Sequence, residues 1–119
     1  MTDAGPPSAA PVHRGEICWL NFDPTQSSEI RKTRPAVVVT ADALNRARRT
    51  VVVVPLSTGP QPHPPLVVAT PSAGASSVAI CDQLRAADKR RLTRNEARLS
   101  ARDLRAIEEG LRRVLELCS

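Results

Sequence analysis

The sequence predicts an α+β fold, in which a small and strongly bent antiparallel sheet or barrel is followed by one C-terminal helix. Three observations support this prediction. The 119 residues are enough for one domain with one core, and two full domains will not fit. Short runs of β-branched residues dominate the chain up to about residue 85, and a helical period follows after residue 100. Strands followed by a helix are typical of α+β domains.

The first strand is expected in GEICWLNF, residues 15–22, where strand-forming side chains alternate. The alternation places Ile17 and Trp19 on one face and Cys18, Leu20 and Phe22 on the other. A tryptophan in such a strand is more often part of a core than of an exposed platform. Residues 1–13, rich in proline and small side chains, are predicted to be a flexible tail, so that residues 14–119 form a single domain.

Four further strands are predicted from apolar runs at residues 35–40, 50–56, 66–70 and 77–85, with a weaker element at 97–99. Residues 41–49 offer a short helix or turn between the second and third strands. Pro55 would remove a hydrogen bond from a central strand, so we expect an edge, a bulge or a strand end there. Residues 23–33 and 57–65 lack an apolar period and are predicted to be exposed loops.

The C-terminal helix is predicted from an apolar stripe at steps of three and four residues. Ser100 followed by Asp103 resembles a capping box, which places the start of the helix. The stripe consists of Leu104, Ile107, Leu111, Val114 or Leu115, and Cys118.

Composition excludes several classes of protein. The apolar runs are too short for a membrane span, and the first residues lack a secretory signal, so a cytoplasmic protein is expected. Three distant cysteines, Cys18, Cys81 and Cys118, form neither a disulfide framework nor a zinc motif, and two histidines are too few for a histidine-rich metal site. No metal or cofactor is therefore expected. The net charge of +5 favours a polyanionic partner, bound by arginines rather than by stacking, since aromatic residues are scarce.

Polar side chains at the expected strand ends are the candidates for chemistry. Arg34 stands directly before a buried strand, and two hydroxyls follow the third strand. An arginine, hydroxyls, carboxylates and an amide could converge on a phosphodiester without a metal. The residues are Glu29, Arg34, Ser57, Thr58, Asp82 and Gln83.

Four blocks of sequence resemble the MazF/PemK family of toxin–antitoxin endoribonucleases, over roughly residues 14–117. The blocks are GEICWLNFDPTQSSEIRKTRPAVVV, VVVVPLST, SVAICDQLRAADKRRL and ARLSARDLRAIEEGLRRVLEL. The resemblance implies an SH3-like barrel with appended helices, a homodimer, and a cognate MazE-like antitoxin that blocks the site. It also implies metal-independent cleavage of single-stranded RNA at short sequences, which leaves 2′,3′-cyclic phosphate and 5′-hydroxyl ends.

The resemblance also assigns roles to individual residues. Arg34 corresponds to the arginine of the family's RP motif, which is essential for cleavage, and a permanently charged bidentate donor suits a scissile phosphate. Ser57 occupies the position of a family threonine, and Thr58 supplies the following hydroxyl. Each also has a structural interpretation: an ion pair with Glu29 for the arginine, and an ordinary turn for the hydroxyls.

The choice of general base stays open between two carboxylates. Glu29 matches the family's SE position, while Asp82 and Gln83 match its strand-borne D/E-Q pair. One branch of the family has an arginine two residues before the aspartate; Ile80 stands there, which gives Arg34 more weight. RNA contacts are expected from Gln83 and from three basic residues, which are Arg31, Lys32 and Arg85.

Several alternatives stay open at the level of the sequence. A toxin of the same fold that inhibits DNA gyrase by protein binding would lack the RP arginine, and a basic RNA-binding barrel would lack activity. His63 is interpreted as an exposed loop histidine. Arg90, Arg91 and Arg94 form either an additional phosphate-binding edge or a basic surface.

Overall fold

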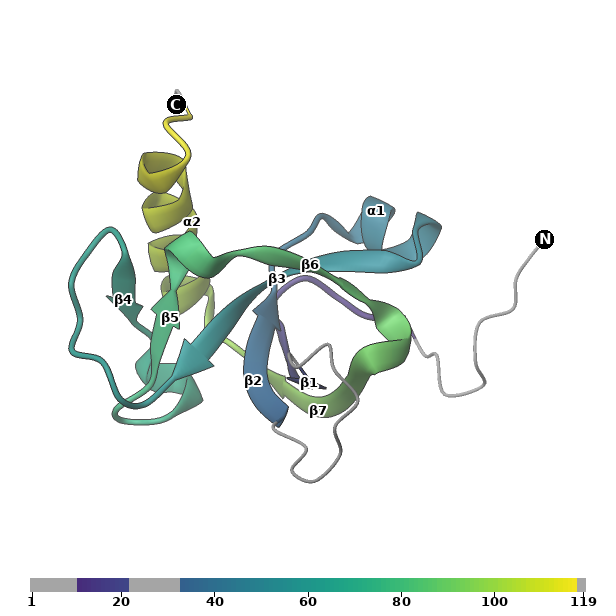
Figure 1. Cartoon of the computed structure of the whole chain (residues 1–119), viewed down its shortest axis with the longest axis horizontal. Helices are drawn as coiled ribbons and strands as arrows, with labels where there is room; N and C mark the ends of the chain where they lie inside the picture. Colours follow the sequence, from purple (N-terminus) through teal and green to yellow (C-terminus); the bar gives the residue numbers. More distant parts are fainter. Residues whose placement is uncertain (1–10, 22–32, 118–119) are drawn as a thin grey trace.

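The computed structural model describes residues 11–21 and 33–117 (Figure 1). It contains seven strands, two α-helices and three short 3₁₀ turns within these residues. None of the helices among these residues is long and apolar enough to cross a membrane. The elements are β1 (Glu16–Asn21), β2 (Thr33–Val38), α1 (Asp42–Ala47), β3 (Thr50–Ser57), β4 (Val67–Ala69), η1 (Pro71–Ala73), β5 (Val78–Ile80), η2 (Cys81–Gln83), β6 (Arg85–Asp88), η3 (Lys89–Arg91), β7 (Leu92–Arg98) and α2 (Ala101–Val114).

The strands form one antiparallel sheet in the order β4-β5-β3-β2-β1-β7, with β6 also paired to β3. The sheet bends strongly, and α2 packs against β4 and the turn η2 (Figure 1). These features confirm the predicted α+β class with a C-terminal helix. The sheet is less closed than a complete barrel, because no pairing among the described strands joins β7 to β4 or β6.

Strand β3 changes its partner midway, and Pro55 lies at the change. Val53 is the last residue of β3 that pairs with β6, and Leu56 is the first that pairs with β5. Pro55 pairs with Ala36 of β2 but falls between the two registers on the other side. The missing N–H therefore costs little there. The expected break in pairing is present, but it lies inside a continuous strand.

One sequence-based strand prediction was wrong, and another was right about the presence of a strand but too short. The strand expected at 77–85 is split into β5 and β6 by the 3₁₀ turn η2, which lets the chain cross from one register on β3 to the other. The weak element expected at 97–99 is the seven-residue strand β7, which pairs with β1. Its sequence, LTRNEAR, is mostly polar because β7 is the end strand of the described sheet, so apolar alternation did not reveal it.

Two apolar clusters lie on opposite faces of the β1–β2–β3 sheet. The helix-side core consists of Ile17, Val37, Val54, Leu56, Val68, Ala79, Cys81, Leu99 and Ile107. The barrel core consists of Val12, Cys18, Leu20, Ala36, Val38, Val51, Val53 and Ala87. Val12 is therefore part of the barrel core, although the sequence predicted it to lie in the flexible tail.

Trp19 corrects another expectation, because its side chain is 40% exposed rather than part of the core. It shares a face with Ile17, as the alternation predicted. It lies two residues further along β1, however, opposite Pro35 and Thr93, where the helix-side core has ended. Alternation identifies a face of a strand but not what covers it.

The start of α2 confirms half of the predicted capping box. The Ser100 hydroxyl accepts a hydrogen bond from the Asp103 N–H at 3.1 Å. The Asp103 carboxylate does not return the bond to Ser100; it accepts from the N–H of Ser72 at 2.7 Å and from the Ser72 hydroxyl. The cap therefore ties α2 to η1. Along the stripe Ile107 is fully buried, whereas Leu115 is exposed beyond the last helical residue.

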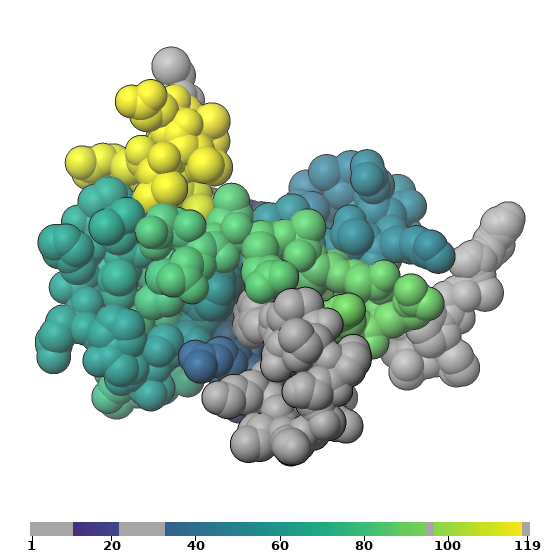
Figure 2. Space-filling view, in the orientation of Figure 1, coloured from purple at the N-terminus to yellow at the C-terminus, as the bar shows by residue number. Residues whose placement is uncertain are grey.

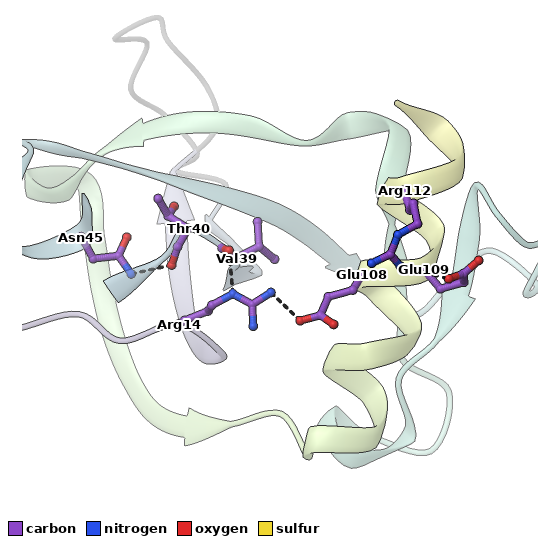
Figure 3. A network of polar contacts seen from close by, with 7 residues as sticks. All are labelled: Arg14, Val39, Thr40, Asn45, Glu108, Glu109 and Arg112. Carbon is purple, nitrogen blue, oxygen red and sulfur yellow. Dashed lines mark hydrogen bonds and ion pairs between the residues drawn. The ribbon is translucent and has the colours of Figure 1, made fainter. Parts of the chain in front are cut away.

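Arg14 connects the start of the sheet to both helices, and Figure 3 shows its contacts with Val39 and with Glu108 of α2. Its guanidinium donates to the Val39 carbonyl at 3.0 Å and pairs with the Glu108 carboxylate at 2.6 Å. Its backbone N–H donates to Asp42 at 2.7 Å. Nearby, the Asn45 amide donates to the Thr40 carbonyl at 2.8 Å and holds the entry to α1. These contacts fix α2 relative to β2.

Gly110 is predicted to be essential for the close packing of α2. A Cβ at this position would lie 2.9 Å from Cys81 Sγ and 3.0 Å from the Pro65 carbonyl oxygen. We expect Gly110→Ala to lower the free energy of unfolding by about 1–2 kcal/mol, because overpacking of about 1–3 kcal/mol outweighs the gain in helix propensity of about 1 kcal/mol. Urea unfolding measures the change, with the exposed Arg105→Ala as the control. Equal or greater stability of Gly110→Ala would contradict the packing argument.

Candidate functional site

Arg34 is the second residue of β2. It pairs with Leu20 of β1, so its side chain leaves the strand on the face of the barrel core, and it is exposed. The pairing of β2 with β3 ends at Ala36 and Pro55, and Arg34 and Ser57 each lie two residues beyond this pair, at the same end of the two strands. The guanidinium and the hydroxyl therefore come from the same end of neighbouring strands.

Ser57 is the last residue of β3 and is half-buried. Its Oγ accepts a hydrogen bond from the Gly59 N–H at 3.3 Å, which shapes the turn that follows. A hydroxyl that accepts in this way still has its own proton to donate, for example to a phosphate oxygen. Thr58 is the next residue and is exposed. Two hydroxyls thus stand where β3 leaves the sheet.

Asp82 and Gln83 lie in the turn η2, not on a strand as the sequence predicted. The turn contacts β3, β4 and α2, and buried Cys81 anchors it in the helix-side core. Asp82 and Gln83 are both exposed. Strand β6 then begins with Arg85, which pairs with Val53 and is exposed on the same face of the sheet as Arg34.

The structure brings Arg34 and Ser57 to the same end of the neighbouring strands β2 and β3, and Thr58 directly follows Ser57. Asp82, Gln83 and Arg85 lie further back along β3, because Arg85 pairs with Val53, four residues before Ser57. No hydrogen bond or ion pair within residues 11–21 and 33–117 joins Arg34, Ser57 or Asp82 to one another. Glu29, Arg31 and Lys32 lie outside the described residues.

The structure shows the surroundings of Arg94 and His63, whose roles the sequence left open. The Arg94 Nε lies 2.5 Å from Glu16 Oε2, and Glu16 is only 2% exposed. Arg94 is therefore a structural partner of a buried carboxylate. His63 is exposed and bridges to Val67 through its backbone. The part of the chain that the structure describes holds no group of three or more His, Cys, Asp or Glu side chains suited to a metal ion.

The two described cysteines are free and buried, and their surroundings disfavour the thiolate. Burial raises the pKa of Cys18 to about 11, with a further contribution from Glu16. Burial also raises the pKa of Cys81 to about 11, and the neighbouring Asp82 adds to the effect. Both thiols are protonated at neutral pH and are poor nucleophiles.

We therefore predict that neither thiol reacts with a thiol reagent in the native protein. In a Cys118→Ser background, Ellman's reagent at pH 8 is expected to detect no fast-reacting thiol before denaturation and both thiols after it, because the thiolate fraction is small and the sulfurs are buried. Rapid reaction of either thiol in the folded protein would show that its surroundings open readily.

Comparison with known proteins places this chain in a family. The chain matches the family of PemK-like, MazF-like toxins of type II toxin–antitoxin systems over residues 13–115. It is 33% identical to the endoribonuclease MazF9 of Mycobacterium tuberculosis over 117 residues, which cover 91% of this chain and 99% of MazF9.

Solved structures agree with this match. The crystal structure of MazF from Deinococcus radiodurans has a TM-score of 0.75 and 27% identity, and covers 91% of this chain and 99% of that one. A MazE–MazF structure from the same organism has a TM-score of 0.77 and 27% identity, with 92% and 99% covered. The chain therefore belongs to the PemK/MazF family of toxins of type II toxin–antitoxin systems.

Proposed function

We propose that this protein is a toxin that cleaves single-stranded RNA at specific short sequences without a metal ion. The observation that supports this most strongly is the register of β2 and β3, which brings an exposed arginine and a hydroxyl to one end of the sheet. This arrangement occurs in a chain that is one-third identical to a protein named an endoribonuclease over nearly its whole length. An arginine and hydroxyls suit the recognition of a phosphodiester.

The proposed reaction uses the RNA's own 2′-hydroxyl as the nucleophile. Its oxygen forms a bond to the adjacent phosphorus while a carboxylate takes its proton. The bond from phosphorus to the 5′-oxygen of the next nucleotide breaks, and that oxygen takes up a proton. The products are a 2′,3′-cyclic phosphate and a 5′-hydroxyl, and no oxidation or cofactor is involved.

Each side chain of the site has a proposed role in this reaction. Arg34 neutralises the charge that develops on the phosphate oxygens, and Ser57 and Thr58 donate hydrogen bonds to them. Either Glu29 or Asp82 acts as the base. The proposed RNA-binding residues are Gln83, Arg31, Lys32 and Arg85.

The proposed partners are a MazE-like antitoxin and a second copy of the chain. Relatives from Deinococcus radiodurans have been crystallised as MazE–MazF structures, which supports an antitoxin partner; we propose that it covers the site. A twofold homodimer would cover the exposed Leu115 and Leu117 at the end of α2. Light scattering at micromolar concentration tests this, since a monomer mass would contradict it. We place the action in the cytoplasm, by a single toxin domain at residues 14–119 preceded by the tail at 1–13.

The function is tested by incubating the purified protein with a long single-stranded RNA in excess EDTA and mapping the 5′ ends. We expect discrete cuts that share a short motif. Absence of cleavage by the folded protein, across diverse sequences, would contradict the proposal. The alternatives of a gyrase-inhibiting toxin and a non-catalytic RNA-binding barrel would then be separated by a supercoiling assay.

A further inference from the structure

A strongly basic surface lies at the opposite end of β3 from Ser57, Thr58 and Arg34 of the candidate site. Two segments form it, the end of α1 with the turn into β3, and the 3₁₀ turn η3 between β6 and β7. The Lys89 N–H donates to the Arg49 carbonyl at 2.9 Å, which joins the segments. Figure 2 shows them side by side, the first in blue and the second in green. We call this surface the basic corner; it consists of Arg46, Arg48, Arg49, Lys89, Arg90 and Arg91.

The charge of the basic corner is not balanced locally. Its five arginines are exposed and its lysine is half-buried. The two carboxylates in these segments already have partners. Asp88 accepts from the Arg90 N–H at 2.8 Å, which with the Arg90 side chain and Arg49 holds its pKa below the usual value. Asp42 accepts from the Arg14 N–H at 2.7 Å.

The concentration of charge is specific to this surface. Six cations against two carboxylates leave four positive charges here, whereas the whole sequence carries +5. Residues 101–117, by contrast, contain four arginines and four acidic residues and are neutral. General basicity of the protein therefore does not explain the basic corner.

Strand β3 connects the basic corner to Ser57 of the candidate site. β3 runs from Thr50, beside the basic corner, to Ser57, and β6 runs alongside from Arg85 to Asp88 (Figure 1). Seven residue steps of about 3.3 Å separate the two ends of β3 by about 23 Å. A single RNA strand that occupies the site can reach the basic corner with its flanking nucleotides.

We propose that the basic corner binds the phosphate backbone of the RNA that flanks the cleavage site, an inference that rests on the proposed function. Arginine forks match phosphate oxygens in a bidentate manner. Residues 41–50 and 86–91 contain no aromatic side chain for stacking a base, so the contact is independent of sequence. It raises affinity for long RNA and leaves the choice of cleavage site to the catalytic end.

The test compares the full-length protein with the variant R46Q/R48Q/R49Q and with the matched control R102Q/R105Q/R113Q. The control removes the same number of exposed arginines from α2. Cleavage is measured on a short RNA that holds only the site and on a long RNA with flanking sequence. Binding is measured with a long 2′-O-methyl RNA, which lacks the nucleophile, at several salt concentrations.

We expect the basic-corner variant to raise KM for the long RNA by about tenfold with kcat unchanged, and to leave the short RNA unaffected. The slope of log affinity against log salt should fall by about 2, since each lost phosphate contact on a single strand removes about 0.7. The control should match the wild type.

Three results would overturn the proposal. The first is an unchanged KM for long RNA, and the second is an equal loss of cleavage on short and long RNA. The third is unchanged RNA binding by a variant that has lost affinity for polyglutamate, which would indicate an acidic protein partner instead. If the wild type cuts no RNA, the proposed function fails, and RNA binding by the basic corner is then judged from the 2′-O-methyl RNA alone. A smaller salt slope in the basic-corner variant supports RNA binding there, and an unchanged slope contradicts it.

Discussion

Replacing Arg34 with alanine is expected to reduce RNA cleavage by at least about 10²–10³-fold, the usual cost of removing a donor that stabilises charge in a transition state. The guanidinium is exposed at the end of β2 and has no hydrogen bond or ion pair to another side chain among the described residues, so the fold should not depend on it. Single-turnover cleavage of a short RNA measures the effect on chemistry. Thermal unfolding checks that the variant is folded.

Two control variants make this result specific. Arg34→Lys keeps the charge but loses the bidentate fork, and we expect it to retain only part of the activity. Arg105→Ala removes an equally exposed arginine from α2 and should cleave like the wild type. Activity of Arg34→Ala within a fewfold of the wild type would show that the catalytic site lies elsewhere.

Replacing Arg94 with alanine is expected to destabilise the fold by about 3–5 kcal/mol, the cost of breaking a buried ion pair from one side. Glu16 is 2% exposed, and its Oε2 lies 2.5 Å from the Arg94 Nε. Its other oxygen accepts only the His13 N–H at 3.0 Å among the described residues. Without the arginine, a buried carboxylate between β1 and β7 loses its counter-charge. Urea unfolding measures the loss.

The paired variant Glu16→Gln with Arg94→Met separates charge from packing. It removes both charges and keeps similar volumes, so it should be more stable than Arg94→Ala alone. A loss below about 1 kcal/mol in Arg94→Ala would show that water reaches Glu16 readily.

Much of the fold could be predicted from local sequence patterns. The apolar runs gave β1, β2 and β3, and the stripe around Ile107 with the Ser100 cap gave α2. The partner switch at Pro55 could be anticipated as an interruption because a proline lacks an N–H. These features depend on propensity and periodicity, which act over a few residues.

The failures share a different cause, because they depend on contacts between distant segments. The break of the 77–85 run into β5, η2 and β6 follows from the two registers on β3. The exposure of Trp19 follows from where the helix-side core ends, and the Asp103 carboxylate bonds Ser72 instead of Ser100 because η1 lies beside the helix. Alternation and spacing contain none of this information.

Part of the candidate site could be predicted from the sequence. The position of Arg34 before Pro35 and of Ser57 at the end of an apolar run marked both as strand-end residues, and the register explains why they face the same end. The joining of residues 46–49 with 89–91 into one basic surface needed the Lys89–Arg49 hydrogen bond, which no local pattern predicts.

The central claim is that the RNA's own 2′-hydroxyl attacks the scissile phosphate at the site around Arg34. The most direct test is mass spectrometry of the fragments from a short RNA cut in excess EDTA, beside the same RNA with one 2′-deoxy sugar on the 5′ side of the cut. We predict a 2′,3′-cyclic phosphate on one fragment, a 5′-hydroxyl on the other, and no cleavage of the 2′-deoxy RNA. Cleavage of the 2′-deoxy RNA, or a 5′-phosphate on the product, would contradict the mechanism.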